Sequence, residues 1–345
     1  NLADAIIGVD SSGTIQEFNA AALNLLDTNE SLEGKTIDSV LKCVDEKNKR
    51  VKFSTELHKT KSVVNRDDLR AHIADETIHL STIYSPIRGI DSGGDDIGKD
   101  GYIMILRDIT KQKSLDEERD EFISVVSHEL RTPITIAEGS LSNARLMMSR
   151  TDMPKQATEN SVKTAHEQVL FLAKMVNDLS TLSRAERGVA DEVEELDVKA
   201  LVHEIYNDYL KDAQAKKLAL DLELEHDLGS VHASKLYLKE LLQNFVTNAI
   251  KYTKDGNVTI HAEHDEGDIR FSVSDTGIGI SKTDQAHIFE KFYRAEDYRT
   301  RETNGTGLGL YVSMKLARKL GTKIEMQSRL NHGSTFSFSL PRVKK

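Results

Sequence analysis

The chain has 345 residues and a formal net charge of −10. This length predicts two or three domains, and the negative balance disfavours binding to nucleic acids or anionic membranes, since both require a basic surface. The single cysteine, Cys43, excludes an intrachain disulfide and indicates a reducing compartment, where we expect it to pack in a core. No apolar run approaches the roughly 18 residues that a membrane span needs, so we expect a cytoplasmic protein. The chain begins inside a folded pattern, which is compatible with a membrane anchor upstream.

Residues 1–110 combine short strand-like segments with glycine-containing turns. The alternation at residues 6–9 and 14–18, joined by a turn with Gly13, predicts a β-hairpin. Residues 91–96 have the composition of a flexible loop. Further strands are expected at residues 77–83 and 102–108. This order of elements predicts an α/β fold and resembles a PAS sensor domain.

Residues 111–187 have a strongly helical composition that only Pro133 and Pro154 interrupt. In the second half, small and apolar side chains recur at alternating steps of three and four, as in the seam of a coiled coil. These positions are Val162, Ala165, Val169, Leu172, Val176, Leu179 and Ser183. We expect two antiparallel helices that turn near residues 151–154, and two such hairpins paired into a four-helix bundle in a homodimer. The alternative is that the stripe packs on another domain of the same chain.

Residues 188–197 are acidic and lack a periodic pattern, which predicts a linker before a third domain at residues 198–345. That domain alternates strand-like and helical segments, so we expect an α/β sandwich with helices on one face of a sheet. The expected strands are residues 218–224, 258–262, 269–273 and 336–340, and the expected helices are residues 198–215, 234–252 and 310–320. The whole chain is therefore predicted to be a multidomain α+β protein.

The segment Ser-His-Glu-Leu-Arg-Thr-Pro occupies residues 127–133 of the first long helix. A neutral imidazole such as that of His128 can attack phosphorus near neutral pH, and the adjacent carboxylate of Glu129 can orient the ring and accept a proton. Thr132 lies four positions after His128 and therefore on the same helical face. Pro133 cannot donate to the carbonyl group of Glu129, which weakens the helix at this point. A lone histidine would be an ordinary solvated residue, so the prediction of catalysis depends on the whole segment.

Polar residues also follow one face of the helix expected at residues 234–252. Asn244, Asn248 and Lys251 are separated by four and three positions, and Tyr252 comes next. Amide oxygens are hard ligands that suit Mg²⁺, and lysine binds phosphate. The alternative is a solvated helix face, but such a face more often carries glutamate and lysine than two amides.

Two glycine-rich turns complete the candidate site. Asp275 ends a strand just before Gly277 and Gly279, and its carboxylate can accept a hydrogen bond from an adenine amino group. Residues 305–310 read Gly-Thr-Gly-Leu-Gly-Leu and open the last helix, where backbone N–H groups and the helix dipole favour phosphates. They are not a Walker P-loop, because no Gly-Lys-Ser/Thr follows. A polar segment between the turns reads as a lid, with the candidate residues Phe289, Tyr293, Arg294, Arg299 and Arg301.

These segments, together with residues 332–336, resemble in type and order the phosphoacceptor box and the N, G1, F, G2 and G3 boxes of sensor histidine kinases of two-component systems. The resemblance implies that Asn248 holds Mg²⁺ and that Asp275 reads adenine. It implies ATP binding by Asn244, Asn248, Lys251, Tyr252, Asp275, Gly277, Gly279, Phe289, Tyr293, Arg294, Arg299, Arg301, Gly305, Thr306, Gly307, Leu308 and Gly309. Asn304 departs from the family, where many relatives carry glycine, but asparagine tolerates left-handed backbone angles.

The same resemblance implies a protein-histidine kinase that uses Mg-ATP to phosphorylate His128 and passes the phosphoryl group to an aspartate of a separate response regulator. We also expect a phosphatase activity toward that regulator, with Thr132 as the candidate residue because it lies one turn from His128. The alternative is that Thr132 merely precedes Pro133 and has no chemical role. Two other functions compete: an ATP-driven clamp, as in chaperones and topoisomerases of the same ATPase clan, and a scaffold with a decayed ATP site. The phosphoacceptor segment argues against the clamp, and the complete set of polar residues argues against the scaffold.

The PAS-like part carries no ligand motif that we recognise. His58, His72 and His79 are scattered, and scattered histidines are usually surface or core residues. Cys43 lacks the Asn-Cys-Arg-type surroundings of flavin-binding light sensors. We therefore predict no cofactor in this domain.

Overall fold

The computed structural model describes most of the chain in six stretches. These are residues 4–74, 76–87, 101–149, 155–187, 192–295 and 305–343. The chain separates into two compact units, Asn1–His128 and Glu129–Lys345, and each is described by itself. The predicted loop at residues 91–96 and the predicted helix turn at residues 151–154 lie outside the described residues. None of the described helices combines the length and the apolar character that a membrane crossing requires.

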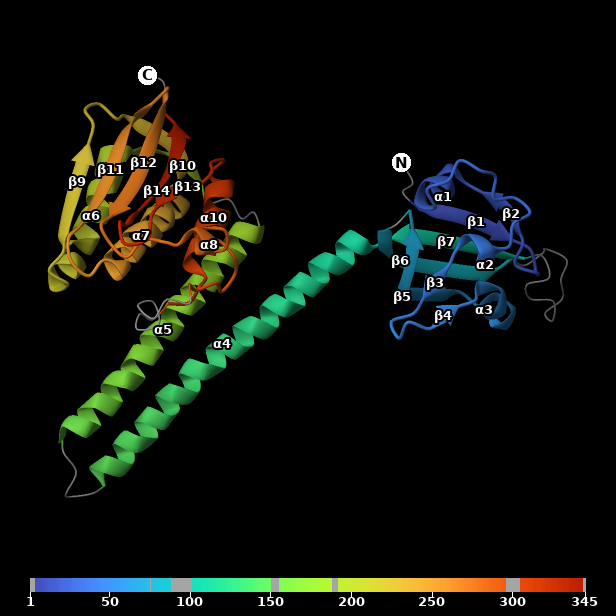
Figure 1. Ribbon diagram of the computed structural model, residues 1–345, viewed down its shortest axis with the longest axis horizontal. Helices are drawn as coiled ribbons and strands as arrows, with labels where there is room; N and C mark the ends of the chain where they lie inside the picture. The colour runs from blue at the N-terminus through green and yellow to red at the C-terminus, as the bar shows by residue number, and fades with distance from the viewer. Residues whose placement is uncertain are drawn as a thin grey trace. The chain divides into compact units, whose positions relative to one another are not determined.

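The first unit contains an antiparallel sheet in the strand order β2-β1-β7-β6-β5-β3-β4 (Figure 1). Its strands are β1 Ala5–Val9, β2 Ile15–Phe18, β3 Cys43–Val44, β4 Arg50–Val51, β5 Val64–Ile73, β6 Glu76–Pro86 and β7 Tyr102–Asp108. Its short helices are α1 Ala20–Leu25, α2 Ile37–Val40 and α3 Phe53–Lys59. The predicted hairpin is confirmed, because β1 pairs antiparallel with β2 and places Ile7 opposite Phe18. On its other edge β1 pairs with β7, the last strand of the unit.

The three short helices cover one face of this sheet. Ala5 and Ile7 of β1 are buried while the residue between them is partly exposed, as the two-residue period of a strand dictates. Ile37 of α2 and Phe53 of α3 belong to the same apolar core. Cys43 is also buried there, and burial raises the pKa of its thiol to about 12. The prediction that Cys43 is a packing residue is therefore confirmed.

Two long helices follow, α4 Thr110–Met148 and α5 Lys155–Arg187. The helix α4 continues through Pro133 without a break. Both helices carry large apolar side chains that are exposed in the single chain and recur every seven residues. These are Ile134, Leu141 and Met148 on α4, and Val162, Val169 and Val176 on α5. A seven-residue repeat keeps such side chains on one side of a helix, where they form a stripe that suits packing against further helices.

The second unit also contains a mixed sheet in the order β13-β14-β12-β11-β9, in which β9 runs parallel to β11 and the other pairs are antiparallel. Its strands are β9 Ala219–Leu224, β11 Asn257–Asp265, β12 Asp268–Asp275, β13 Glu325–Ser328 and β14 Ser334–Pro341. Its helices are α6 Val198–Ala215, α7 Lys235–Tyr252, α8 Lys282–Gln285 and α10 Gly309–Lys319. The predicted sandwich is confirmed, because α6, α7 and α10 share one apolar core with a single face of the sheet.

A separate two-stranded sheet corrects the predicted linker. Val193–Asp197 forms strand β8, which pairs antiparallel with β10 Ser230–Ser234. The linker prediction is therefore wrong for residues 193–197. Only Leu196 is buried in β8, so the pairing depends on backbone hydrogen bonds and produces no alternating apolar pattern. The first part of the predicted linker, residues 188–191, lies outside the described residues.

Aromatic packing fixes α7 over the centre of the larger sheet. The ring of Phe245 on α7 lies 5.3 Å from that of Phe336 and 6.2 Å from that of Phe338, both on β14. Phe271 of β12 stacks on Phe338 with centroids 5.2 Å apart. Aromatic pairs of this kind bury a large area and also favour particular orientations of one ring against the other. They hold the polar face of α7 close to the ends of β12 and β14.

Candidate functional site

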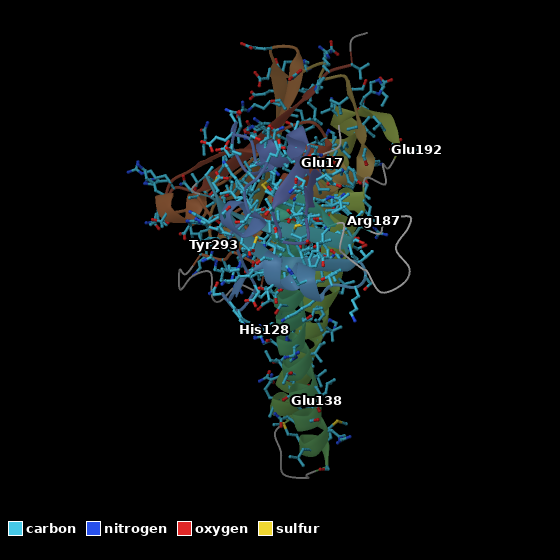
Figure 2. The ribbon with its side chains drawn as sticks, turned by 90° about the vertical axis from the view of Figure 1, so that its right-hand side faces the viewer. Glu17, His128, Glu138, Arg187, Glu192 and Tyr293 are labelled. Carbon is cyan, nitrogen blue, oxygen red and sulfur yellow. The ribbon has the colours of Figure 1, made fainter. Side chains whose placement is uncertain are left out.

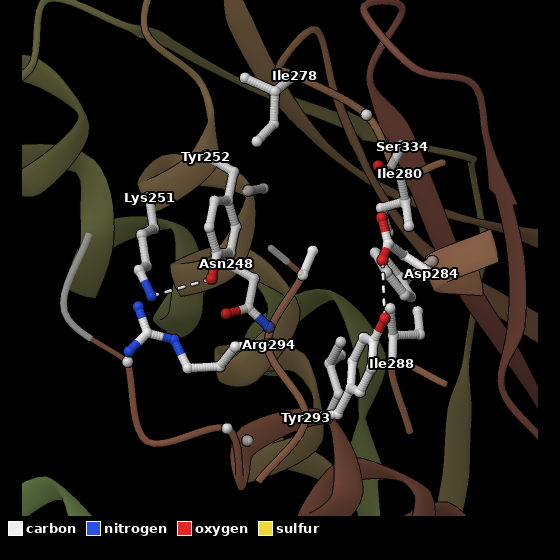
Figure 3. A pocket seen from close by; sticks show the side chains of 18 of the residues that line it. Asn248, Lys251, Tyr252, Ile278, Ile280, Asp284, Ile288, Tyr293, Arg294 and Ser334 are labelled. Carbon is white, nitrogen blue, oxygen red and sulfur yellow. Dashed lines mark hydrogen bonds between the residues drawn. The ribbon is translucent and has the colours of Figure 1, made fainter. Parts of the chain in front are cut away.

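A pocket in the second unit opens between α7, the turn after β12, the start of α10 and the helix α5 (Figure 3). Most of the predicted ATP-site residues line it. They are Asn244, Asn248, Lys251, Tyr252, Asp275, Gly279, Tyr293, Arg294, Gly305, Thr306, Gly307 and Gly309. Gly277, Phe289 and Leu308 lie outside the lining, and Arg299 and Arg301 lie outside the described residues. Tertiary packing thus brings together motifs that are far apart in the sequence.

Asp275 lines the pocket from the last position of β12. Burial raises the pKa of its carboxyl group, and hydrogen bonds from the backbone N–H groups of Gly277 and Ser334 oppose that shift. The bond from Gly277 to Asp275 Oδ1 measures 2.8 Å. A carboxylate held by backbone donors has a fixed orientation, which suits the recognition of a planar hydrogen-bond donor such as an adenine amino group.

The glycines after Asp275 are required by close backbone contacts. A Cβ on Gly277 would lie 2.6 Å from the carbonyl oxygen of Tyr252, so this residue packs behind the wall rather than in it. Gly279 has φ +63°, and a Cβ there would collide with the carbonyl group of Arg329. Six large apolar residues also line the pocket. They are Ile278, Ile280, Ile288, Leu310, Leu330 and Phe336.

The polar face of α7 forms the cationic end of the pocket. Asn244, Asn248 and Lys251 all line it, as their helical spacing predicted. The ammonium group of Lys251 donates to the hydroxyl group of Tyr252 over 3.0 Å (Figure 3). Burial, and after it the positive charge of Lys174, lowers the pKa of Lys251 to about 8. This concentration of positive charge favours an anionic group beside α7.

The second glycine-rich turn closes over the same end. Gly307 has φ +68°, and a Cβ there would lie 2.7 Å from the backbone of Phe292. Leu308 is buried beneath the turn, and its N–H donates to Thr306 Oγ1 over 3.2 Å. The helix α10 then begins at Gly309 with no side-chain cap on its first amides. Uncapped amides at a helix N-terminus are a favourable site for phosphate oxygens.

The predicted lid residues fall into two groups. The hydroxyl group of Tyr293 donates to Asp284 Oδ1 over 2.7 Å at the pocket wall (Figure 3). Arg294 also lines the pocket. Phe289 instead packs against the apolar core of the second unit. Two of the predicted lid residues therefore line the pocket and one packs in the core, and the lid itself stays a prediction.

The histidine of the phosphoacceptor segment lies on α4, away from any helix end (Figure 2). His128 and Thr132 are exposed, and Glu129 is half-buried. Because α4 is continuous through this segment, His128 and Thr132 lie one turn apart on one face, as predicted. The imidazole is therefore accessible to a reaction partner.

Two family models match the chain. The one described as "His Kinase A (phospho-acceptor) domain" matches residues 118–188, and the one described as "Histidine kinase-, DNA gyrase B-, and HSP90-like ATPase" matches residues 233–344. Drug sensory protein A of Synechocystis sp. is 33% identical over 251 residues, which cover 70% of this chain and 37% of that protein. The chain belongs to the sensor histidine kinases.

Two further proteins are similar to this chain. The alginate biosynthesis sensor protein KinB of Pseudomonas aeruginosa is 27% identical over 343 residues, covering 98% of this chain and 55% of the relative. The solved structure of the histidine kinase AdeS of Acinetobacter baumannii is 27% identical, with a TM-score of 0.50 and coverage of 63% of this chain and 98% of that chain. The chain spans 37% of the length of Drug sensory protein A and 55% of the length of KinB.

Sequence reasoning missed several pocket residues of this kinase. Ile278 and Ile280 alternate with the predicted glycines of the turn, and this position was the only feature of the sequence that could have indicated a place in the pocket. Asp284 and Ser334 are brought in by tertiary packing. Lys174 lies on α5, in the helical region, where no local pattern marks it as part of a pocket.

Proposed function

We propose that this kinase phosphorylates its own His128 with Mg-ATP and passes the phosphoryl group to an aspartate of a separate response regulator. The observation that carries the proposal is the pocket itself. It combines a fixed carboxylate at Asp275, amides and a lysine on α7, and a glycine turn with uncapped amides before α10. The same chain presents an exposed imidazole within a phosphoacceptor segment.

The proposed orientation of the nucleotide matches each of its groups to pocket residues of complementary chemistry. The adenine amino group donates to Asp275, and the apolar residues near Ile278 cover the base. The phosphates lie toward Lys251 and the turn at Gly305 and Gly307, where positive charge and backbone N–H groups concentrate. This orientation follows from the position of the carboxylate of Asp275 and from the cations that gather around Lys251.

The phosphoryl group is transferred twice, first from an oxygen of ATP to a nitrogen of His128 and then to a carboxylate oxygen of the regulator. The neutral imidazole of His128 attacks the γ-phosphorus, an N–P bond forms, and the bond to the β–γ bridging oxygen breaks, so that ADP leaves. Glu129 accepts the ring proton that the phosphorylated imidazole releases. A carboxylate oxygen of the regulator then attacks phosphorus, the N–P bond breaks, and the ring nitrogen takes back a proton, which restores the neutral imidazole of His128.

The residues present fit a magnesium ion that shares its ligands with the nucleotide. Asn248 and Asn244 supply amide oxygens at the cationic end. A Cβ added at Gly309 would lie 3.1 Å from Asn244 Oδ1, so the start of α10 packs closely against this amide. Among the described residues no group of three or more His, Cys, Asp or Glu side chains could hold a metal. Mg²⁺ characteristically takes one or two protein ligands and completes its shell with phosphate and water. Asn248 would hold the ion, which would neutralise phosphate charge when bound.

The N-terminal unit is proposed to be a PAS-like sensor without a resident cofactor. Its central strand order β2-β1-β7-β6-β5, with helices on one face, supports this reading. The domain boundaries near residues 110 and 187 stay predictions for the same chain, whereas strand β8 at residues 193–197 pairs with β10 and belongs to the third domain. The exposed seven-residue repeats on α4 and α5 support a homodimer in which two hairpins form a four-helix bundle.

A second function, an ATP-driven clamp, has the support of the ATPase fold alone. The match to a phosphoacceptor domain at residues 118–188 favours the kinase instead. A clamp would hydrolyse ATP without modifying itself. Covalent labelling therefore distinguishes the two functions.

The first prediction tests autophosphorylation. With γ-labelled Mg-ATP the chain should acquire a label that is labile in acid and stable in base, because a phosphoramidate forms on the imidazole. His128→Ala should lose all label. His166→Ala, which changes another exposed histidine on the helical hairpin, is the matched control and should keep the wild-type level. Labelling that persists in His128→Ala would refute the proposal.

A further inference from the structure

The helix α5 supplies part of the nucleotide pocket. Lys174 lines the pocket although it belongs to the helical region and not to the ATPase domain. In the second half of α5, Met175, Asp178 and Leu182 are buried, whereas in the first half only Ala165 is. Within the second unit, therefore, the part of α5 that carries Lys174 packs against the ATPase fold.

One buried hydrogen bond fastens this part of α5 to the glycine turn. Thr306 Oγ1 donates to Asp178 Oδ2 over 2.9 Å, and both residues are buried, with exposed fractions of 5% and 7%. The same hydroxyl group accepts the N–H of Leu308 over 3.2 Å. Burial raises the pKa of Asp178, and the bond from Thr306 opposes that shift. A buried carboxylate is costly without a partner, so this contact ties the turn to α5.

Lys174 lies one turn before Asp178 and acts on the cationic end of the pocket. Its charge is the largest electrostatic influence that lowers the pKa of Lys251, after burial. No ion pair of Lys174 is found among the described residues, although its charge also acts on the carboxyl group of Asp178 and lowers the pKa of that group. Two ammonium groups placed close together at a pocket wall repel one another unless an anion lies between them.

We propose that Lys174 is a nucleotide-binding residue that α5 contributes to the pocket, where it contacts the polyphosphate of a nucleoside di- or triphosphate, and that Asp178 is a positioning residue which holds the glycine turn beside it. This inference extends the proposed kinase function. A nucleoside monophosphate, with its single phosphate near the base, does not reach Lys174. The pocket is then complete only while the ATPase domain is docked on α5, and by reciprocity a bound polyphosphate strengthens that docking.

The test compares the affinities of the full chain for ADP and AMP by calorimetry. Lys174→Gln should weaken ADP binding about fivefold, the range of a partly exposed charge pair, and leave AMP binding unchanged. Lys163→Gln is the matched control, because it removes an α5 lysine whose described partner is Glu167. An equal loss for ADP and AMP, or no loss for ADP, would overturn the role of Lys174.

A test of the positioning role of Asp178 must measure a quantity that general destabilisation of the fold leaves unchanged. Asp178→Ala should lower the ratio of ADP to AMP affinity as much as Lys174→Gln does, while Asp178→Asn, which still accepts from Thr306, should restore it. The double variant Lys174→Gln with Asp178→Ala should be no worse than either single change, because both act on one contact. AMP affinity reports whether each variant is folded.

Different results would refute the proposed kinase function and the proposed contribution of α5. A wild-type chain that does not bind ADP would refute the proposed kinase function. A wild-type chain that binds ADP normally, with unchanged selectivity in Lys174→Gln, would refute only the contribution of α5. An additive double variant would refute the link between Asp178 and Lys174 while leaving the kinase assignment intact.

Discussion

The phosphoacceptor segment and the nucleotide pocket of this kinase are built in different ways. His128, Glu129 and Thr132 lie within five consecutive positions of one continuous helix. The pocket instead combines residues such as Lys174 and Asp275, which come from different elements and meet only after the domain has packed. A helical segment depends mainly on its own backbone, whereas an assembled site depends on every contact that aligns its elements. Substitutions should therefore affect the two regions differently.

The largest loss of ATP affinity is expected when a glycine of the turn after Asp275 is replaced. Gly279→Ala places a Cβ against the carbonyl group of Arg329 in a left-handed backbone position, so the turn after Asp275 must shift. We expect ATP affinity to fall more than about a hundredfold, since displacement of the turn costs several contacts together. Equilibrium binding of ATP measures the effect.

The matched control for this change is Gly321→Ala. Gly321 also has a positive φ, +75°, but nothing lies within 4 Å of its added Cβ. Both variants carry the same backbone strain of about 1 to 2 kcal/mol, so the difference between them isolates the steric contact. If Gly321→Ala weakened ATP binding as strongly as Gly279→Ala, general destabilisation rather than pocket geometry would be responsible.

A smaller effect is expected where one hydrogen bond changes and the backbone does not. Asp275→Asn preserves the shape of the side chain but removes the charged acceptor for adenine. A hydrogen bond to a charged group contributes about 1.5 to 3 kcal/mol, so ATP affinity should fall roughly ten- to a hundredfold. Calorimetry would measure it, with Asp268→Asn at the other end of β12 as the control. Wild-type affinity in Asp275→Asn would remove this residue from base recognition.

The same contrast explains which features could be predicted from the sequence. The helices α6 and α7 and the strands β11 and β12 carry clear periodicities, because each has one buried face, and they were predicted within a few residues. The strand β8 was missed because a single buried residue, Leu196, leaves no period to detect. Periodicity reports burial, and an edge strand held by backbone pairing buries little.

The site follows the same rule. Asn244, Asn248 and Lys251 were predicted to share a helical face, and all three line the pocket. Lys174 could not be predicted, because its role depends on how α5 packs against the ATPase domain, and that packing leaves no signature near Lys174 itself. The spacing of residues along the sequence shows which side chains share one face of a helix or strand. Only the structure reveals which elements face one another.

The smallest effect on autophosphorylation is expected for Thr132. Its hydroxyl group lies one helical turn from His128, where it can orient a water molecule for in-line attack on the acyl phosphate of the regulator. Phosphorylation of His128 requires no such water. Thr132→Ala should therefore keep autophosphorylation and lose the phosphatase activity, whereas Glu129→Ala should mainly impair autophosphorylation, because it removes the carboxylate that accepts the ring proton.

The deciding measurement is the decay of purified phosphorylated regulator in the presence of ADP and either wild-type or Thr132→Ala kinase. Threonine to alanine on an exposed helix face is favourable for the helix, so a lost activity would not reflect unfolding. Thr135→Ala is the control, since Thr135 is also exposed on α4 and its hydroxyl group bonds the carbonyl oxygen of Arg131 over 3.0 Å. Equal decay with wild-type and Thr132→Ala kinase would mean that Thr132 merely precedes Pro133, and that the phosphoacceptor helix carries only the forward reaction.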